Sequence, residues 1–402
     1  MVIMLMTTRR PRAAMAAAGL MTLFIVSTTG CASGGGAAEG TPSTRVSGQE
    51  KARAKEGLVD ILVAGRPITG TKPSGHAKIP YQRTYAEGEL YAAVTGYRSL
   101  AFGSAGLESI YKDVHGTVET TIDPALQRAA AEGLRGRKGA AVALDAETGR
   151  IRALMSTPSY DPSAFSGYAN ADRAAWKEVT DSRDHPLLNR ALRSTAPLGR
   201  TSHVVVAAAA LEKGLYATVD VPTRTPGAAG QCANASIRQA LQHGCDEVFT
   251  GMASEVGQEA LRSMAEALGF NEKALDVPVR VAESTYRDGE TTATPLQMAR
   301  VMAVLGNGGK QLGPRLVDRV VHGDGSVQKP TTYTAAGRQV VKRETADQLR
   351  TALSDRATGD GWSLALTRAA GGRLVALAVY AKGAGDDDMS AVVDRMAKAA
   401  TG

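Results

Sequence analysis

The chain has 402 residues, of which 43% are hydrophobic and 22% charged, and its 47 basic and 40 acidic residues give a formal net charge of +7. This balance is typical of a globular protein and excludes a disordered tail, and at about 100–200 residues per domain the length predicts about two domains. Aromatic residues make up only 4%, which weighs against a protein that stacks single-stranded nucleic acid on aromatic side chains. Three cysteines cannot form a disulfide scaffold, and no Cys/His cluster has the spacing of a zinc site. We therefore expect no metal, no cofactor and no nucleic-acid partner.

The first thirty residues have the pattern of an export signal. Three arginines within residues 9–12 precede an uncharged, largely apolar stretch that ends in small residues before Cys31. A basic start, an apolar run of about 14 residues and a small-residue cleavage site are typical of a secretory signal peptide, and the run is shorter than the roughly 20 residues that span a bilayer. The Gly30-Cys31 junction resembles a bacterial lipobox, so we expect residues 1–30 to be removed and Cys31 to carry a lipid. An ordinary signal peptide, which would release a secreted protein, and an uncleaved anchor are the alternatives.

Residues 31–56 are rich in glycine, alanine, serine and small polar residues, and we expect them to form a flexible, lipid-anchored tether. Anchor and tether together predict a folded part at the outer face of the cytoplasmic membrane, where disulfides are permitted. Removal of residues 1–30 takes away three of the 47 basic residues and none of the 40 acidic ones, which leaves a net charge of +4. Part of the basic surplus is therefore an export signal.

The folded part is predicted to have a small β-rich N-terminal region, residues 57–120, with strands over 58–63 and 90–95, followed by a mostly helical domain, residues 121–402. Asp123 and Pro124 are a favourable helix start, because aspartate caps a helix and proline fits its first turn. Hairpins are expected over 140–155, around 323–325 and over 362–380, and helices at about 124–134, 201–213, 236–242, 246–256, 257–268, 295–305, 344–353 and 387–399. Hairpins at both ends of a helical segment predict one antiparallel sheet with helices on its faces.

Five segments, in order along the chain, carry a resemblance to a known family. They are YQRTYAEGELYAAVTGYRSLAFGSAGLESIY (81–111), TTIDPALQRAA (120–130), GAAVALDAETGRIRALMSTPSYDP (139–162), PLLNRAL (186–192) and TPLQMARVMAVLGNGG (294–309). Each is similar to a segment of the class B penicillin-binding proteins, the cell-wall transpeptidases, and of their actinobacterial members in particular. The resemblance covers about residues 80–400 and implies an α+β fold of the penicillin-binding-protein and serine β-lactamase type, a five-stranded antiparallel sheet between helical clusters.

Acyl transfer in this family needs a nucleophilic serine and, one helical turn later, a lysine that helps to remove its proton. The segment PLGRTSH (197–203) matches the family's Pro-Pro-Gly-Ser-Thr-Phe-Lys stretch, which places Arg200 at the serine position and His203 at the lysine position. A guanidinium stays protonated and has no lone pair with which to attack. Ser202 is no substitute for the nucleophile, since Val205 stands where a lysine would be needed. His203 could act as a base, but the side chain of an adjacent helical residue points about 100° away from Ser202.

Two Ser-x-x-Lys strings occur elsewhere, at Ser109–Lys112 and Ser326–Lys329. The first lies in the N-terminal region and the second follows a Gly-Asp-Gly turn, and neither opens a helix after PLLNRAL. Such a short string recurs by chance, so we assign neither a catalytic role.

The second family motif, Ser-x-Asn, matches Gly244-Cys245-Asp246. Gly244 has no hydroxyl, and Asp246 carries a negative charge where the family has a neutral amide, which disfavours a substrate carboxylate nearby. We expect Cys232 and Cys245 to form a disulfide in the oxidising compartment. Two free thiols, or a nucleophilic Cys245, are the alternatives.

The third motif, Lys-Thr/Ser-Gly, does not occur in the sequence, and its nearest remnant is Ala357-Thr358-Gly359. Only two strand-like runs follow Leu353 where the family has three. We therefore expect the edge strand of this motif to be shortened or missing, because the loss of an edge strand breaks only one ladder.

The motif changes together predict a catalytically inactive, membrane-tethered protein that acts by binding peptidoglycan or wall-synthesis proteins. Loss of the nucleophile alone lowers turnover by about 10⁶-fold in a comparable serine enzyme, and here every motif is altered. Arg200 and His203 would then bind an anion, or Arg200 would be a surface or ion-paired residue. An active D,D-transpeptidase or β-lactam-binding acyltransferase that uses other residues is the alternative, and a folded remnant with little role is a third possibility.

Overall fold

The computed structural model describes residues 58–76, 78–272, 279–287, 290–329, 337–354 and 356–402. The predicted export signal, Cys31 and the tether lie outside these residues. Within the described ranges, no helix is both long enough and apolar enough to cross a membrane.

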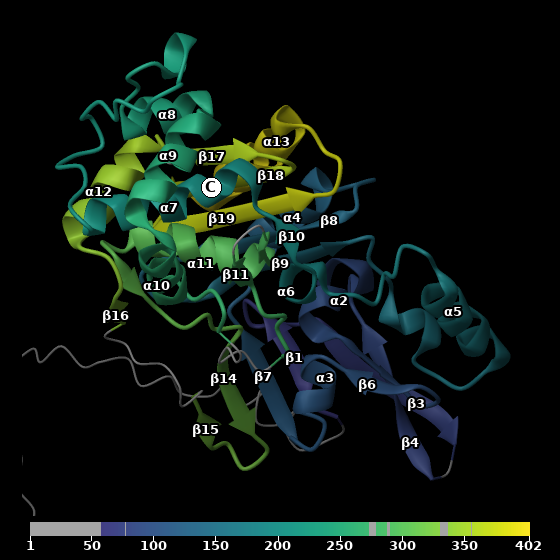
Figure 1. Ribbon diagram of the computed structural model, residues 1–402. Coiled ribbons are helices and arrows are strands. Elements are labelled where there is room, and N and C mark those ends of the chain that lie inside the picture. The colour runs from purple at the N-terminus through teal and green to yellow at the C-terminus, as the bar shows by residue number, and fades with distance from the viewer. Residues whose placement is uncertain (1–57, 77, 273–278, 288–289, 330–336, 355) are drawn as a thin grey trace, which may run out of the picture. The chain divides into compact units, whose positions relative to one another are not determined.

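Five antiparallel strands form the central sheet, in the order β17-β18-β19-β8-β9 (Figure 1). They are β8 (Gly139–Asp145), β9 (Ile151–Thr157), β17 (Arg356–Gly359), β18 (Trp362–Arg368) and β19 (Leu374–Ala381). The side chains of a strand alternate between its faces, so Val142 and Leu144 enter one hydrophobic core and Ala141 and Ala143 the other. The hairpins predicted at the two ends of the domain are therefore strands of one antiparallel sheet, as expected.

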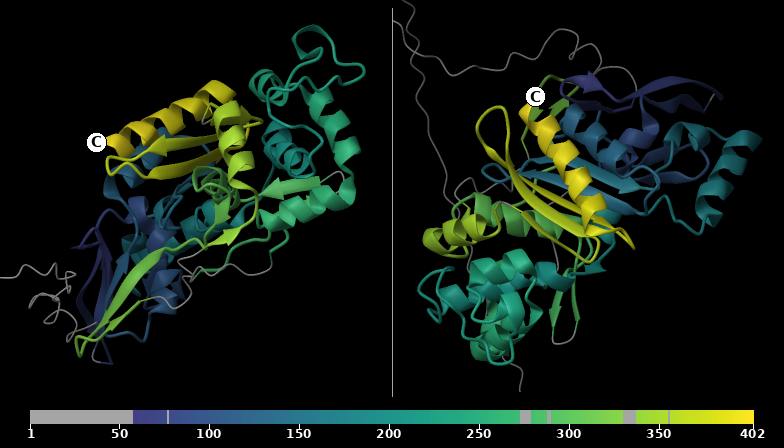
Figure 2. Two further views of the ribbon diagram at one scale, coloured as in Figure 1. Left: turned by 90° about the vertical axis from the view of Figure 1, so that its left-hand side faces the viewer. Right: turned by 90° about the horizontal axis from the view of Figure 1, so that it is seen from above.

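Helices cover both faces of this sheet. α4 (Pro124–Gly133) and α13 (Asp386–Thr401) pack on one face, and α11 (Pro295–Gly306) packs on the other (Figure 2). A cluster of helices lies next to α11, and its member α12 contacts α11. The cluster consists of α7 (His203–Glu212), α8 (Ile237–His243), α9 (Asp246–Val256), α10 (Gln258–Ala267) and α12 (Arg343–Ala352). Every helix predicted from the sequence is present within a few residues of its expected bounds, and the Asp123 side chain caps α4 as predicted.

The N-terminal region forms a second sheet together with a later hairpin, in the order β15-β14-β7-β1-β2. The strands are β1 (Asp60–Val63), β2 (Arg66–Pro67), β7 (Gly116–Thr120), β14 (Val317–His322) and β15 (Val327–Gln328). The hairpin predicted around residues 323–325 is thus found, and it pairs with β7 of the N-terminal region. The domain boundary between residues 120 and 121 stays a prediction.

Shorter elements complete the structure. The strands are β3 (Thr69–His76), β4 (Ile79–Tyr85), β5 (Tyr97–Ser99), β6 (Gly103–Ala105), β10 (Ala196–Pro197), β11 (Thr285–Arg287), β12 (Glu290–Ala293), β13 (Lys310–Gln311) and β16 (Arg338–Gln339). The helices are α3 (Leu107–Ile110), α5 (Asn170–Asp181), α6 (Arg190–Arg193) and the 3₁₀ turns η1 (Pro162–Phe165), η2 (Gly199–Ser202) and η3 (Gly230–Cys232).

The strand predicted over residues 90–95 is wrong, since these residues belong to helix α2 (Gly88–Thr95). A short run of aromatic and β-branched residues fits a strand and a buried helix equally well. The helix is favoured here because Tyr91 and Val94, three positions apart, lie on one face and are both buried in the core.

The count of two strand-like runs after Leu353 is also wrong, because β17 is a third. It is a short edge strand of four residues. Asp360 and Gly361 form the two-residue turn to β18, and both have a positive φ, of 56° and 81°. Asp-Gly is a favoured sequence for such a hairpin turn, and this pair is the signal that was missed.

Candidate functional site

The segment that carries Arg200 lies where the central sheet meets the helical cluster. β10 leads into the turn η2, which continues directly as α7. Trp362, which is fully buried at the start of β18, donates its Nε1 hydrogen to the carbonyl oxygen of Pro197 at 2.8 Å. This bond holds the start of the segment against the sheet, and η2 itself contacts the edge strand β17.

The Arg200 side chain lies between the other two altered motifs. Its Nη1 is 2.9 Å from the position that a Cβ would take at Gly244, and its Nε is 3.0 Å from the corresponding position at Gly359. Its Nη2 donates to the Asp386 carboxylate, at the start of α13, at 2.8 Å. The three motif positions predicted from the sequence therefore meet in one place, and the Arg200 side chain occupies the space between them.

The backbone amide of Arg200 is also engaged within the chain. It donates to Oδ2 of Asp360, in the turn after β17, at 3.0 Å. Backbone N–H groups at a nucleophile position commonly stabilise the oxyanion in serine acyl-transferases. Gly199 makes room for the carboxylate, since a Cβ there would lie 1.8 Å from Asp360 Oδ2. A carboxylate of the chain itself thus accepts the hydrogen bond of this amide.

The hydroxyl of Ser202, the serine nearest to the nucleophile position, donates to the carbonyl oxygen of Gly199 at 2.6 Å. Its proton therefore points to the main chain of the preceding turn. A nucleophilic serine needs its hydroxyl hydrogen-bonded to a base, and this contact does not provide one.

His203 is largely buried, with 13% of its side chain exposed, and its environment keeps it neutral. Its ring stacks on Phe249 with centroids 4.1 Å apart, and its Nε2 lies 3.4 Å from the Asp246 carboxylate. Burial, the largest cause, lowers the pKa of His203 to about 4; Asp246 opposes this effect, and the Arg200 charge adds to it. At neutral pH the imidazole is therefore uncharged and contributes no positive charge for an anion.

The loop that carries the second motif is held by a disulfide. Gly244 ends α8 in the left-handed conformation, with φ of 66°, which favours glycine. Cys245 is buried and is joined to Cys232 by a disulfide bond, so its sulfur is not a free thiol in this structure. Asp246 follows as the first residue of α9 and is largely exposed.

The third motif position lies on the edge strand β17. Thr358 pairs with Ser363 of β18, and Gly359 faces Arg200. Ala357 precedes Thr358, so the strand presents a methyl group where the family has a lysine. The ammonium group that would bind a substrate carboxylate is therefore replaced by an apolar side chain.

The two Ser-x-x-Lys strings lie on other elements. Ser109 belongs to the short helix α3 of the N-terminal region, and Ser326 to the turn between β14 and β15. Neither string forms part of η2 or α7.

Two residues of the site, Asp360 and Asp386, were not predicted. The Asp-Gly turn signals a hairpin at residues 360–361, but nothing in the sequence indicates that its carboxylate reaches Arg200, which is 160 residues away. Asp386 opens a run of three aspartates at the start of α13. Acidic residues are common in the first turn of a helix, so this run carried no sign of a partner 186 residues earlier.

Comparisons with known proteins agree with the sequence motifs. Residues 139–376 match the penicillin binding protein transpeptidase domain, and residues 60–138 match the penicillin binding protein A dimerisation domain. The chain is 30% identical over 337 residues to the peptidoglycan D,D-transpeptidase PbpA of Mycolicibacterium smegmatis. The aligned part makes up 69% of this chain and 69% of that protein.

Solved structures give the same result. The crystal structure of PBPA from Mycobacterium tuberculosis has a TM-score of 0.77 at 26% identity and covers 88% of this chain and 99% of that one. The penicillin G acyl-enzyme complex of penicillin-binding protein A from M. tuberculosis has a TM-score of 0.76 at 25% identity, with 85% and 99% covered. These matches confirm the family resemblance and the α+β fold class that the sequence predicted.

The buried, neutral state of His203 predicts a pH dependence of stability. An unfolded histidine has a pKa of about 6.5, above the folded value of about 4, so the unfolded state binds more protons between these two values. The contribution of neutral His203 to the free energy of unfolding is therefore fully present above pH 6.5, and about 3 kcal/mol of it is lost as the pH falls to 4. Urea unfolding at several pH values should show this loss in the wild type and not in His203→Gln.

The matched control is His243→Gln, which removes an exposed histidine of α8 and should retain the loss of stability that is assigned to His203. If His203→Gln and the wild type lost stability in parallel on acidification, the assignment to His203 would be wrong.

The contact between Arg200 and Gly244 predicts that substitutions at the two positions are coupled. Gly244→Ala introduces a left-handed alanine, at a cost of about 1 kcal/mol, and a Cβ that crowds Nη1 of Arg200. We expect Gly244→Ala to cost about 1–2 kcal/mol in the wild type, and only the backbone share of about 1 kcal/mol when Arg200 is already alanine. Unfolding free energies of the four proteins in this double-mutant cycle test the coupling.

Gly214→Ala provides the backbone control. Gly214 has φ of +75°, and among the described residues no atom beyond its chain neighbours lies within 4 Å of the position that a Cβ would take. Equal costs of Gly244→Ala with and without Arg200 would show that the guanidinium does not occupy this space in solution.

Proposed function

This chain belongs to the penicillin-binding protein transpeptidase family, and we propose that it is a non-catalytic member that acts by binding in peptidoglycan synthesis. The observation that carries the proposal is the position of Arg200. Its guanidinium stands at the nucleophile position and fills the space between the other two motifs, where the peptide or β-lactam carbonyl would have to enter.

Each chemical part of acyl transfer has a specific obstacle in this site. Arg200 has no lone pair, His203 is a buried neutral ring without a serine hydroxyl to deprotonate, and Asp360 accepts the hydrogen bond of the amide that an oxyanion would need. Each obstacle concerns a different chemical group, so relief of any one of them leaves the others in place.

The ion pair with Asp386 does not by itself keep the site closed. Its two side chains are 40% and 39% exposed, and an exposed pair contributes no more than about 1 kcal/mol. The Arg200 side chain can therefore move aside at small cost. Such a movement opens the space but supplies no nucleophile, and this is why the proposal rests on residue chemistry and not on blockage alone.

We place the binding role at the cell wall. The relatives of the chain are peptidoglycan D,D-transpeptidases, which supports peptidoglycan or wall-synthesis proteins as partners. The basic and apolar start of the sequence and the Gly30-Cys31 junction support export and a lipid anchor at the outer face of the cytoplasmic membrane.

The first test is covalent labelling by penicillin. We expect the purified protein, incubated with a fluorescent penicillin, to show no adduct by gel fluorescence or intact mass, because loss of a serine nucleophile alone lowers turnover by about 10⁶-fold. Penicillin-binding protein A from M. tuberculosis, which forms a penicillin G acyl-enzyme complex, serves as the positive control under identical conditions.

A stoichiometric adduct would overturn the non-catalytic proposal. The variant Ser202→Ala would then separate two explanations, since loss of the adduct in this variant would identify Ser202 as the nucleophile, and its persistence would direct the search to another residue.

The second test concerns anchoring and binding in cells. We expect radiolabelled palmitate to be incorporated into the wild type and not into Cys31→Ser, and the wild type to fractionate with the membrane. Crosslinking in intact cells should recover peptidoglycan or a wall-synthesis enzyme with the anchored protein. An unlabelled wild type would rule out the lipid anchor, and recovery of neither class of partner would rule out the binding role.

A further inference from the structure

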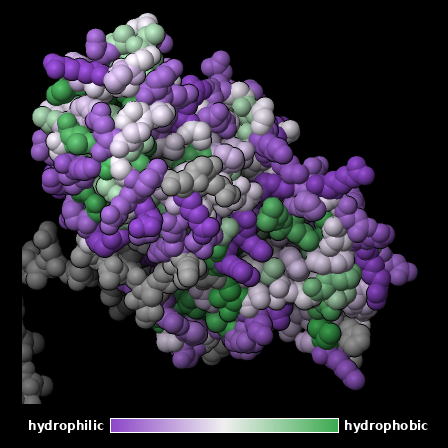
Figure 3. Space-filling model, viewed as in Figure 1, coloured by the Kyte–Doolittle hydropathy of each residue, from purple (hydrophilic) through white to green (hydrophobic). Residues whose placement is uncertain are grey.

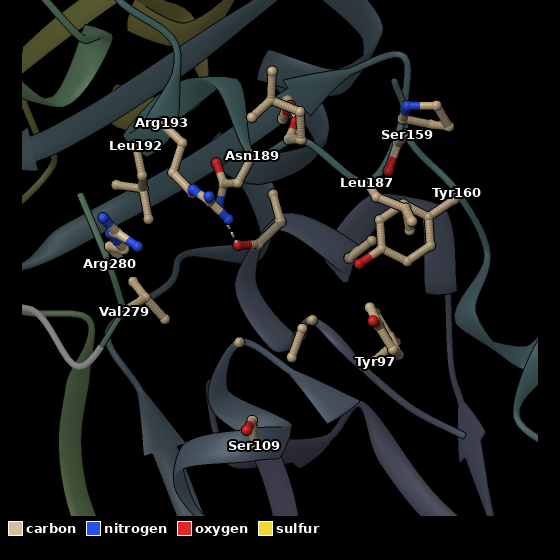
Figure 4. Close-up of a pocket in the computed structure, with 18 of the residues that line it drawn as sticks. Tyr97, Ser109, Ser159, Tyr160, Leu187, Asn189, Leu192, Arg193, Val279 and Arg280 are labelled. Carbon is tan, nitrogen blue, oxygen red and sulfur yellow. Dashed lines mark hydrogen bonds between the residues drawn. The ribbon is translucent and has the colours of Figure 1, made fainter. Parts of the chain in front are cut away.

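A pocket of about 330 Å³ opens between the N-terminal region and the C-terminal domain (Figure 4). None of the six motif positions predicted from the sequence lines it. Its volume is within the range of about 300–1,000 Å³ that is typical of small-molecule sites, which often lie where two parts of a chain meet.

Small residues create the space at the N-terminal wall. Ala92 and Ala93 of α2, Gly96 and Ala105 line this side. Gly96 cannot be larger, since its φ is +72° and a Cβ would lie 2.1 Å from the carbonyl oxygen of Ala105. The backbones of Gly96 and Ala105 therefore lie close together, and the small side chains on this side leave the volume of the pocket open.

Another part of the lining is aromatic and aliphatic. Tyr97 and Tyr160 lie side by side, with ring centroids 6.4 Å apart in an edge-to-face arrangement, next to Leu187 (Figure 4). Burial raises the pKa of both tyrosines, so both are neutral phenols at physiological pH. Hydrophobic side chains also reach the surface near α2, α5 and α6 on the face shown in Figure 3. This part of the pocket suits an apolar or aromatic group.

The other end of the pocket carries two positive charges. Arg193 of α6 and Arg280 both line it and both are exposed (Figure 4). No described carboxylate lies within ion-pair distance of either guanidinium, and none of the described lining residues is acidic. Arg190, one turn earlier on α6, differs, because it is buried and donates to the main-chain oxygens of Asp184 and His185. Within the part of the chain that the structure describes, Arg193 and Arg280 therefore have no acidic partner that would account for them.

One buried acceptor in the pocket wall also lacks a partner. The Nδ2 group of Asn189 donates to the carbonyl oxygen of Ala93 at 2.8 Å, whereas its buried Oδ1 has no hydrogen-bond partner among the described residues. A buried polar atom of this kind is rare unless something satisfies it, and a ligand N–H or O–H would do so.

We propose that this pocket binds a small amphipathic anion, with its anionic group held by Arg193 and Arg280 and its apolar body packed against Tyr97, Tyr160 and Leu187. Guanidinium groups form charge-assisted hydrogen bonds with carboxylates and phosphates, and the neutral aromatic wall provides the dry surface for the rest of the molecule. This inference does not depend on the proposed function, because no motif residue takes part in it.

The test uses 8-anilinonaphthalene-1-sulfonate, a fluorescent aromatic anion, with the full-length protein. We expect one saturable site, and we expect Arg193→Ala/Arg280→Ala to weaken binding by about tenfold or more. N-phenyl-1-naphthylamine has a similar body without the charge, and its binding should change by less than about threefold in the same variant. Arg173→Ala/Arg262→Ala, which removes two exposed arginines outside the pocket, should leave both affinities unchanged.

A third variant separates this pocket from non-specific surface binding. Ser109→Phe fills the pocket from α3 and should abolish the binding of both probes, while thermal unfolding verifies that all variants remain folded. Equal affinity of the anionic probe for the wild type and Arg193→Ala/Arg280→Ala, or retained binding in a folded Ser109→Phe variant, would overturn the proposal.

Discussion

The space that the Arg200 side chain occupies is the constraint on which the rest of the altered site depends. A guanidinium can stand at the nucleophile position only if the two facing motifs make room for it, and both present glycine there, Gly244 and Gly359. A serine at position 244 would bring a Cβ to within 2.9 Å of Nη1. Arg200 and Gly244 are therefore coupled, because the family's serine at position 244 would crowd the guanidinium without rebuilding the chemistry, whereas Gly359 is the glycine that the family motif also has.

The charges around Arg200 follow from the same arrangement. Its side chain forms an ion pair with Asp386, and its backbone amide donates to Asp360. Two carboxylates from different elements thus hold this one arginine. His203, a few residues along the chain, is held neutral chiefly by burial against Phe249. The region that should attract a substrate carboxylate in an active relative thus has its positive charge already balanced from within the chain, and long-range electrostatic attraction of an anion is weak there.

The fold was predictable where local signals were strong. The Asp123-Pro124 helix start predicted α4, and the two terminal hairpins predicted four of the five strands of the central sheet, all except β17. The errors came where one short pattern fits two structures, as in α2, where Tyr91 and Val94 suit a strand or a helix. For the site, the sequence predicted which residues stand at the motif positions, but not the contacts that they make. The partners Asp360 and Asp386 could not be predicted, because they meet Arg200 through a turn and a helix end that only the folded sheet brings together.

The stability of the scaffold explains how the catalytic residues can differ while the fold persists. The two hydrophobic cores pack on opposite faces of the central sheet, and both contain residues such as Val142, Leu154 and Leu377 that lie outside the motifs. Burial of apolar side chains dominates folding free energy, whereas an exposed ion pair such as that of Arg200 contributes about 1 kcal/mol or less. The folding free energy therefore depends little on which residues stand at the motif positions, and the fold can persist while these residues change.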